Sequence, residues 1–219
     1  MKTSSFGGSA FKKNSSGIAV WGLVLALVLT STGCNEKKDP EVEQLKSKVA
    51  DLEKRLDKIE APLLAKAQLE ERQKSLHEAA NHRFQLDQKN YNAQQMVQIE
   101  SLYQQVSKTR AGSPERVAAV NKLTDQFPDA NRTGCAMLYV AQGATGAEAE
   151  KYFQACIQKY GSCFYGDGVQ VGAYARYGLA EYYKKNQQLD KAEALRNEIK
   201  EQFPDSVDHS GKLLVDLMQ

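Results

Sequence analysis

The chain has 219 residues, a formal charge of +2 at pH 7 and 26% charged residues, which suits a small domain joined to an extended element. This near-neutral balance supplies no basic surface for DNA or RNA, so we expect no nucleic-acid partner.

The first 33 residues are typical of a cleaved export signal. Lys2, Lys12 and Lys13 form a basic leader without an acidic residue, and Ile18 to Leu29 is an apolar run of twelve residues. A membrane-spanning helix needs about 20 residues, so this run is too short to cross a bilayer. Removal of residues 1–33 with their three lysines lowers the formal charge from +2 to −1.

Cys34 follows the apolar run, and Leu29-Thr30-Ser31-Thr32-Gly33-Cys34 resembles a bacterial lipoprotein signal. The resemblance implies that the Cys34 thiol carries diacylglycerol, that cleavage precedes it, and that the new amino terminus is acylated, for example with palmitate. Several acyl chains anchor a protein stably without a spanning helix. Asn35 replaces the Asp that implies inner-membrane retention, so we expect an outer-membrane lipoprotein facing the periplasm. Secretory cleavage nearby and an uncleaved anchor are the alternatives.

A short polar tether, residues 34–40, leads into an apolar seam at residues 41–63. The apolar side chains recur at alternating steps of three and four residues, which predicts a coiled-coil stalk. The seam consists of Val42, Leu45, Val49, Leu52, Leu56 and Ile59, with Leu63 at its end.

The charges beside the seam favour a parallel homo-oligomer. With Val42 at heptad position a, each g residue faces an oppositely charged e′ residue: Glu41 with Lys46, Lys48 with Glu53, and Arg55 with Glu60. Val at a with Leu at d favours a dimer, whereas Leu56 with Ile59 favours higher order. Homodimer and homotrimer therefore both stay open, and a lone helix packed on its own domain is the alternative.

Pro62 predicts a kink or a stop, because proline removes a backbone donor from a helix. Residues 64–92 contain no Gly or Pro and are rich in good helix formers, which predicts a polar linker helix. His77 and His82 are five residues apart, whereas two metal ligands on one helix face prefer four. We interpret them as solvated surface.

An internal repeat marks residues 93–219. Gln126-Phe127-Pro128-Asp129 recurs as Gln202-Phe203-Pro204-Asp205 after 76 residues, two units of 34 plus eight extra residues. Ala149 and Phe153 fit a unit between the two copies. Ser113 and Pro114 mark a helix start.

The last unit resembles a tetratricopeptide repeat, whose pattern is W-x2-L-G-x2-Y, then A-x3-F, then P. The matching residues are Leu179, Ala180, Tyr183, Ala192 and Pro204. Arg176 and Arg196 replace the Trp and Phe, and Arg116 replaces the Ala of the first unit. The resemblance implies an all-α chain, with a TPR-like α-solenoid of about three helical hairpins after the coiled-coil helix. Its concave side would bind protein segments, and Gly211–Gln219 would be a capping helix.

The eight extra residues fall within Ser162–Gly172, a loop with several glycines and aromatic residues. These aromatic residues and their neighbours suit a partner-binding surface. The candidates are Phe164, Tyr165, Asp167, Tyr174 and Tyr177. The alternative is that the loop only fills a gap between uneven repeats.

Three cysteines remain besides Cys34. Export permits a disulfide, for which Cys135 and Cys163 are the candidate pair, with Cys156 as a buried apolar residue. Their spacing matches no metal site, and we expect no cofactor. Cys163 as a nucleophile with His209 as its base lacks the turn that such sites use, so we expect no enzyme.

These observations predict a membrane-tethered, oligomeric envelope adaptor that binds envelope proteins or peptide segments. The order of export signal, coiled coil, linker and repeats resembles that of the periplasmic coiled-coil and tetratricopeptide proteins that coordinate cell division with the Tol system. A structural envelope lipoprotein acting through its stalk is one alternative. A lipoprotein subunit of an outer-membrane assembly complex is the other.

Overall fold

The computed structural model describes residues 40–218, and these residues are helical apart from short loops and two isolated β-bridges. The expectation of an all-α chain is confirmed for this part. The export signal, the lipidation site Cys34 and the tether before Pro40 lie outside the described residues. The described residues divide into two units, the first ending at Asp57 and the second beginning at Lys58. Within residues 40–218, none of the helices combines the length and the apolar character needed to cross a membrane.

The described part of the first unit belongs to helix α1 (Pro40–Asn90), and every residue from 40 to 57 is exposed. Glu41 and Glu43 lie in the first turn, where negative charges stabilise the helix by their interaction with its dipole. The helix continues through Pro62, so the predicted stop there is wrong, whereas the alternative of a kink stays a prediction. One lost backbone hydrogen bond is outweighed because Ala61, Leu63 and the residues beyond them are good helix formers.

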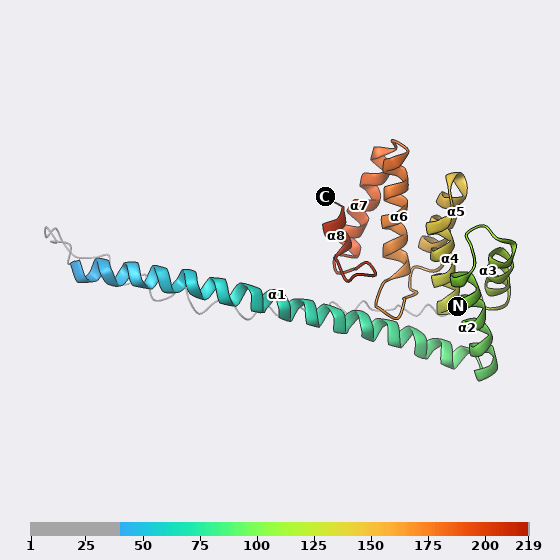
Figure 1. Ribbon diagram of the computed structural model, residues 1–219, viewed down its shortest axis with the longest axis horizontal. Coiled ribbons are helices and arrows are strands. Elements are labelled where there is room, and N and C mark those ends of the chain that lie inside the picture. Colours follow the sequence, from blue (N-terminus) through green and yellow to red (C-terminus); the bar gives the residue numbers. More distant parts are fainter. Residues whose placement is uncertain (1–39, 219) are drawn as a thin grey trace, which may run out of the picture. The chain divides into compact units, whose positions relative to one another are not determined.

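The second unit contains three consecutive pairs of helices (Figure 1). Neighbouring pairs pack on each other through α2 with α4 and α5 with α6. The helices are α2 (Ala93–Lys108), α3 (Pro114–Gln126), α4 (Asn131–Gly143), α5 (Gly146–Lys159), α6 (Val171–Lys185), α7 (Leu189–Gln202) and α8 (Leu214–Leu217).

The predicted helix start at Ser113 is confirmed, because its hydroxyl accepts a hydrogen bond from the backbone N–H of Arg116 at 3.3 Å. Only Tyr91 and Asn92 separate α1 from α2. Asn92 and Gln95 form a capping box, in which each side chain accepts from the backbone of the other. The chain therefore turns where the predicted linker ends.

The three arginines at unexpected repeat positions are mostly buried, and each has a partner. Arg176 lies over the ring of Phe203 at 4.8 Å and pairs with Glu198 at 2.8 Å. Arg196 pairs with Glu181 at 3.0 Å, and Arg116 lies over the Tyr139 ring. Stacking and pairing replace the apolar contacts that the repeat pattern would supply.

Two loops, 163–171 and 206–214, have the same backbone hydrogen bonds, 43 residues apart. In the first, Tyr165 N–H donates to Val169 O and Val171 N–H to Cys163 O, both at 2.9 Å. The second repeats these bonds from Asp208 N–H to Lys212 O at 2.8 Å and from Leu214 N–H to Ser206 O at 2.9 Å. The extra residues are therefore a recurring element and not a single insertion.

The second loop uses most of the segment that was expected to form the capping helix. Val207 and Leu213 form a β-bridge, so helix α8 begins only at Leu214 and is four residues long. Leu214 and Met218 still cover α6 and α7 by packing against Ala173 and Ile199.

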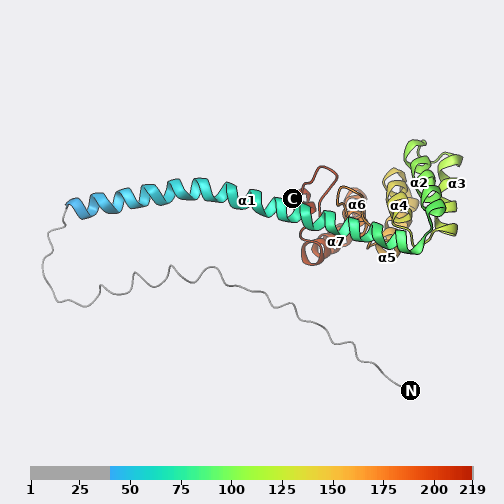
Figure 2. The same cartoon turned by 90° about the horizontal axis from the view of Figure 1, so that it is seen from below.

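Residues 72–90 of α1 belong to the second unit and run across the loops at one end of its helical pairs (Figure 2). Leu76 packs on the core at Gly168, and Arg72 pairs with Asp205 at 3.2 Å. The second unit thus begins before residue 93, where the sequence predicts the start of the repeat domain. The sequence between the stalk and the first pair is part of the packed domain.

Candidate functional site

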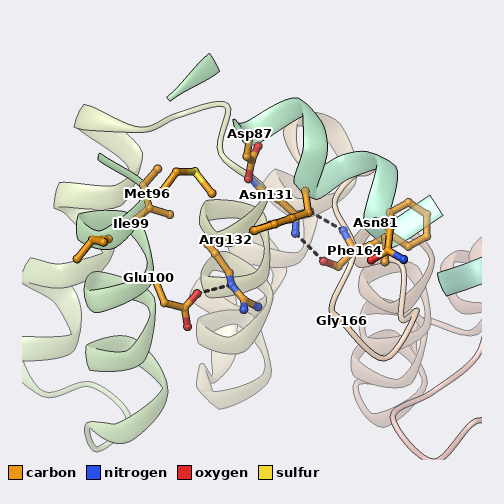
Figure 3. A pocket seen from close by; sticks show the side chains of 12 residues that line it. Asn81, Asp87, Met96, Ile99, Glu100, Asn131, Arg132, Phe164 and Gly166 are labelled. Carbon is orange, nitrogen blue, oxygen red and sulfur yellow. Dashed lines mark hydrogen bonds and ion pairs between the residues drawn. The ribbon is translucent and has the colours of Figure 1, made fainter. Parts of the chain in front are cut away.

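An apolar groove of about 520 Å³ lies between α1, α2, the start of α4 and loop 163–171 (Figure 3). Its apolar lining consists of Ala80, Phe84, Met96, Val97, Ile99 and Phe164. The Phe84 side chain is 50% exposed and that of Val97 is 70% exposed. Large exposed apolar side chains beside a concave surface are typical of a protein-binding site.

The groove follows from the way in which α1 and α2 divide their side chains between core and surface. On α2, Ile99, Leu102 and Val106 are buried at helical spacing, so the neighbouring Val97 points out of the core. On α1, Ala80 and Asp87 are buried, while Phe84 lies between them in sequence and stays exposed. Each helix thus contributes one large apolar side chain to the open side.

Asn131, the first residue of α4, joins two walls of the groove. Its backbone N–H donates to Asp87 Oδ2 on α1 at 2.8 Å. Its side-chain amide donates to the Phe164 carbonyl at 2.7 Å and accepts from the Phe164 N–H at 2.8 Å. Figure 3 shows this side chain reaching toward Phe164. The paired bonds fix the backbone of loop 163–171 beside the groove.

Asp87 occupies the position of a helix cap for α4. The residue before Asn131, Ala130, offers no side-chain cap, and the Asp87 carboxylate accepts from the helix's first N–H. Burial raises the pKa of Asp87, although the Asn131 N–H and the charges of Arg83 and Arg132 act in the opposite direction. Desolvation outweighs these favourable contacts.

The polar edge of the groove is an ion pair between α2 and α4. Arg132 Nε donates to Glu100 Oε2 at 2.8 Å, and the guanidinium lies over the Tyr103 ring at 4.5 Å. Figure 3 shows Arg132 turned toward Glu100. With both charges engaged, the groove mainly offers its apolar surface to a ligand.

Tyr165 was expected on a partner-binding surface, and this expectation is wrong. Its side chain is buried, and its hydroxyl donates to the Cys135 carbonyl at 2.7 Å, so it fills the space between loop and α4. Burial raises the pKa of Tyr165. Phe164 is half-buried and lines the groove, and it remains a candidate contact.

The other candidates, Asp167, Tyr174 and Tyr177, lie apart from the groove lining and are linked to one another through His209. Asp167 Oδ2 is 2.7 Å from His209 Nδ1, which joins loop 163–171 to loop 206–214. The His209 ring packs on Tyr165 and Tyr174, and Tyr174 also packs on Tyr177. The sequence-based candidates omitted Phe84 and Val97, whose signal is an apolar residue on the polar face of its helix.

Cys135, Cys156 and Cys163 are all buried free thiols, so the candidate disulfide between Cys135 and Cys163 is not formed. The Cys135 thiol instead contacts the Phe164 carbonyl, with 3.4 Å between sulfur and oxygen. Burial raises the pKa of each thiol. Cys156 is fully buried in the core, as expected. Among residues 40–218, no group of three His, Cys, Asp or Glu side chains is arranged to hold a metal ion.

No family model, curated protein or solved structure matches this chain.

Proposed function

We propose that this chain is a membrane-tethered, oligomeric adaptor of the bacterial envelope that binds protein partners through a TPR-like repeat domain. The main support for this proposal is the apolar surface that the described residues leave exposed, on the stalk and at the groove. Apolar surface gathered in a stripe and in a concavity favours protein contacts.

The stalk supports the oligomeric part of the proposal. The seven apolar side chains of the seam, from Val42 to Leu63, are 46–61% exposed. Covering this stripe with a second copy removes it from water, and the opposite charges of the g and e′ residues favour a parallel arrangement. A lipid on Cys34 would start every copy at the same membrane, which also favours parallel helices.

The helical pairs support the adaptor part. Successive packed pairs are the arrangement from which tetratricopeptide-like solenoids are built, and such stacks present extended binding surfaces. The groove adds a site with two exposed apolar side chains, Phe84 and Val97, and a fixed edge at Phe164. We propose that an apolar segment of an envelope protein binds there.

A structural lipoprotein that acts through its stalk is the second candidate, and the exposed seam favours it equally. The two proposals differ in whether the groove contacts another protein. An outer-membrane assembly subunit would be one particular kind of adaptor.

Photocrosslinking in living cells separates these proposals. A photoreactive phenylalanine analogue at Phe84 should crosslink to a different protein, whereas the same analogue at Val117, an equally exposed apolar position on α3, should not. Val97→Asp should abolish the Phe84 crosslink, and Leu189→Asp, at another exposed apolar site, should leave it intact. Identical crosslinks from both positions would exclude the groove as the binding site.

Labelling with radioactive palmitate tests the tether. The mature chain should incorporate label, and Cys34→Ala should abolish it. Label that persists in the Cys34→Ala variant would exclude this anchor site.

A further inference from the structure

We propose that residues 72–90 of α1 form a strap that docks reversibly on the helical pairs and builds one wall of the groove only while docked. The helical pairs stay folded when the strap leaves. The docking equilibrium belongs to the chain itself, and only its effect on partner binding depends on the proposed function.

The docked face of the strap combines polar and apolar side chains, and among the apolar ones only Ala80 is buried. The buried and partly buried residues are Arg72, Leu76, Ala79, Ala80, Arg83, Leu86 and Asp87. The main hydrophobic core includes no buried residue from α1, and Leu76 only packs against its edge. Undocking therefore exposes little apolar surface, and the helical pairs keep their own continuous core.

The charged contacts of the strap are incompletely satisfied. Asp87 is 2% exposed, yet its Oδ1 has no hydrogen-bond partner among the described residues, and neither has the buried Nε of Arg83. Arg83 Nη1 lies 3.9 Å from Asp87 Oδ1, close enough for attraction but too far for a hydrogen bond. Both groups lie on the strap, so undocking does not separate them. It breaks their hydrogen bonds to the domain, from Arg83 Nη2 to the Asp129 carbonyl and from the Asn131 N–H to Asp87 Oδ2, and the return of two largely buried charges to water offsets that loss.

A two-residue hinge separates the strap from α2. Tyr91 is held on the domain by its ring contact with Phe127, at 5.7 Å between centroids. Asn92 is held by the capping box with Gln95. The strap can therefore swing from Asn90 while α2 stays in place, as hinges need only a few residues at the end of an element.

Binding of a partner in the groove is thermodynamically coupled to docking of the strap. Ala80, Asn81, Phe84 and Asp87 supply the α1 wall of the groove. A partner that contacts this wall binds only the docked state, so it must shift the equilibrium toward docking. Conversely, substitutions that favour undocking of the strap weaken the binding of the partner.

Hydrogen exchange at Asn131 measures docking in the unliganded chain without altering the strap. The Asn131 N–H donates to Asp87 Oδ2, and as the first amide of α4 it has no partner within its own helix once the strap leaves. The Cys135 amide, in the second turn of α4, is the internal reference. We expect Asn131 to exchange at least about tenfold faster than Cys135, by local opening.

Two substitutions complete the test. Leu76→Ala weakens docking without touching the Asn131 bond, so it should speed Asn131 exchange several-fold and leave Cys135 unchanged. Leu189→Ala, at an exposed site on α7, should change neither rate. Equal exchange of both amides, rising together in Leu76→Ala, would show that strap and domain unfold as one and would overturn the proposal. That result would not decide the outcome of the Phe84 crosslinking experiment, which tests the proposed function separately.

Discussion

Gly168 and Gly211 occupy the same position in two loops that lie 43 residues apart, and both have positive φ, +90° and +81°. They differ in what surrounds them. A Cβ on Gly168 would lie 2.9 Å from the Leu76 Cβ on the strap, whereas a Cβ on Gly211 would have no neighbour within 4 Å.

Alanine substitutions at these two glycines distinguish the cost of backbone strain from the cost of a steric clash. Gly211→Ala should destabilise the fold by about 1–2 kcal/mol, the cost of the left-handed conformation for a residue with a side chain. Gly168→Ala should cost more than this, by at most the free energy with which the strap docks, because Leu76 must either move or undock with the strap. Urea unfolding of both variants measures the difference. Equal losses would mean that the contact of Leu76 with the loop adds no stability.

Gly172, the second residue of α6, tests the close contact of this helix with the turn at Gly161 after α5. An added Cβ would lie 2.7 Å from the Gly161 Cα and carbonyl oxygen, and a backbone cannot yield as a flexible side chain does. Gly172→Ala should therefore destabilise the domain by about 1–3 kcal/mol. Gly143→Ala is the control, because its Cβ would meet Ala111 only at 3.4 Å. Thermal unfolding that ranks Gly143→Ala as the worse change would contradict the packing described.

Arg176 tests the substitution at the repeat's Trp position. Arg176→Lys keeps the charge but loses the planar stack on Phe203 and the directed bond to Glu198, so we expect a loss of about 1 kcal/mol. Lys200→Arg, at an exposed pair with 4.0 Å to Glu193, should be neutral. Chemical unfolding compares the two, and a wild-type midpoint for Arg176→Lys would show that the stack contributes nothing.

The burial of Asp87 predicts how the stability of the folded state changes with pH. Because burial raises its folded-state pKa, the folded state favours the protonated carboxyl, and this stability is lost as pH rises from 3.8 through the raised pKa. Asp87→Asn keeps an acceptor for the Asn131 N–H without carrying a charge. Its stability relative to wild type should therefore increase between about pH 4 and pH 7. Urea unfolding at both pH values checks this; a relative stability that falls with pH would contradict the burial of Asp87 as a costly charge.

The helical pairs could be predicted because their signals are local. The repeated Gln-Phe-Pro-Asp motif and the cap at Ser113 each mark a helix end or start. The second loop was missed because a period of 34 residues was assumed, which hides the match of Gly168 with Gly211.

The groove and the strap could not be predicted because their signals conflict with the usual pattern. Asp87 is buried and Arg83 partly buried although their spacing suggests a solvated face, and Phe84 is exposed although it is apolar. Tyr165 lies in a glycine-rich loop, where an aromatic side chain could equally be exposed for binding or buried in the core. Only its bond to the Cys135 carbonyl decides between them.

Sedimentation equilibrium of the chain from residue 34 onward, with Cys34→Ser to exclude lipid, tests the central proposal most directly. The account predicts a dimer or a trimer that becomes a monomer in Leu52→Asp, while Leu189→Asp leaves its mass unchanged. A monomer at concentrations of about 100 μM would contradict the oligomeric stalk, and with it the proposed adaptor.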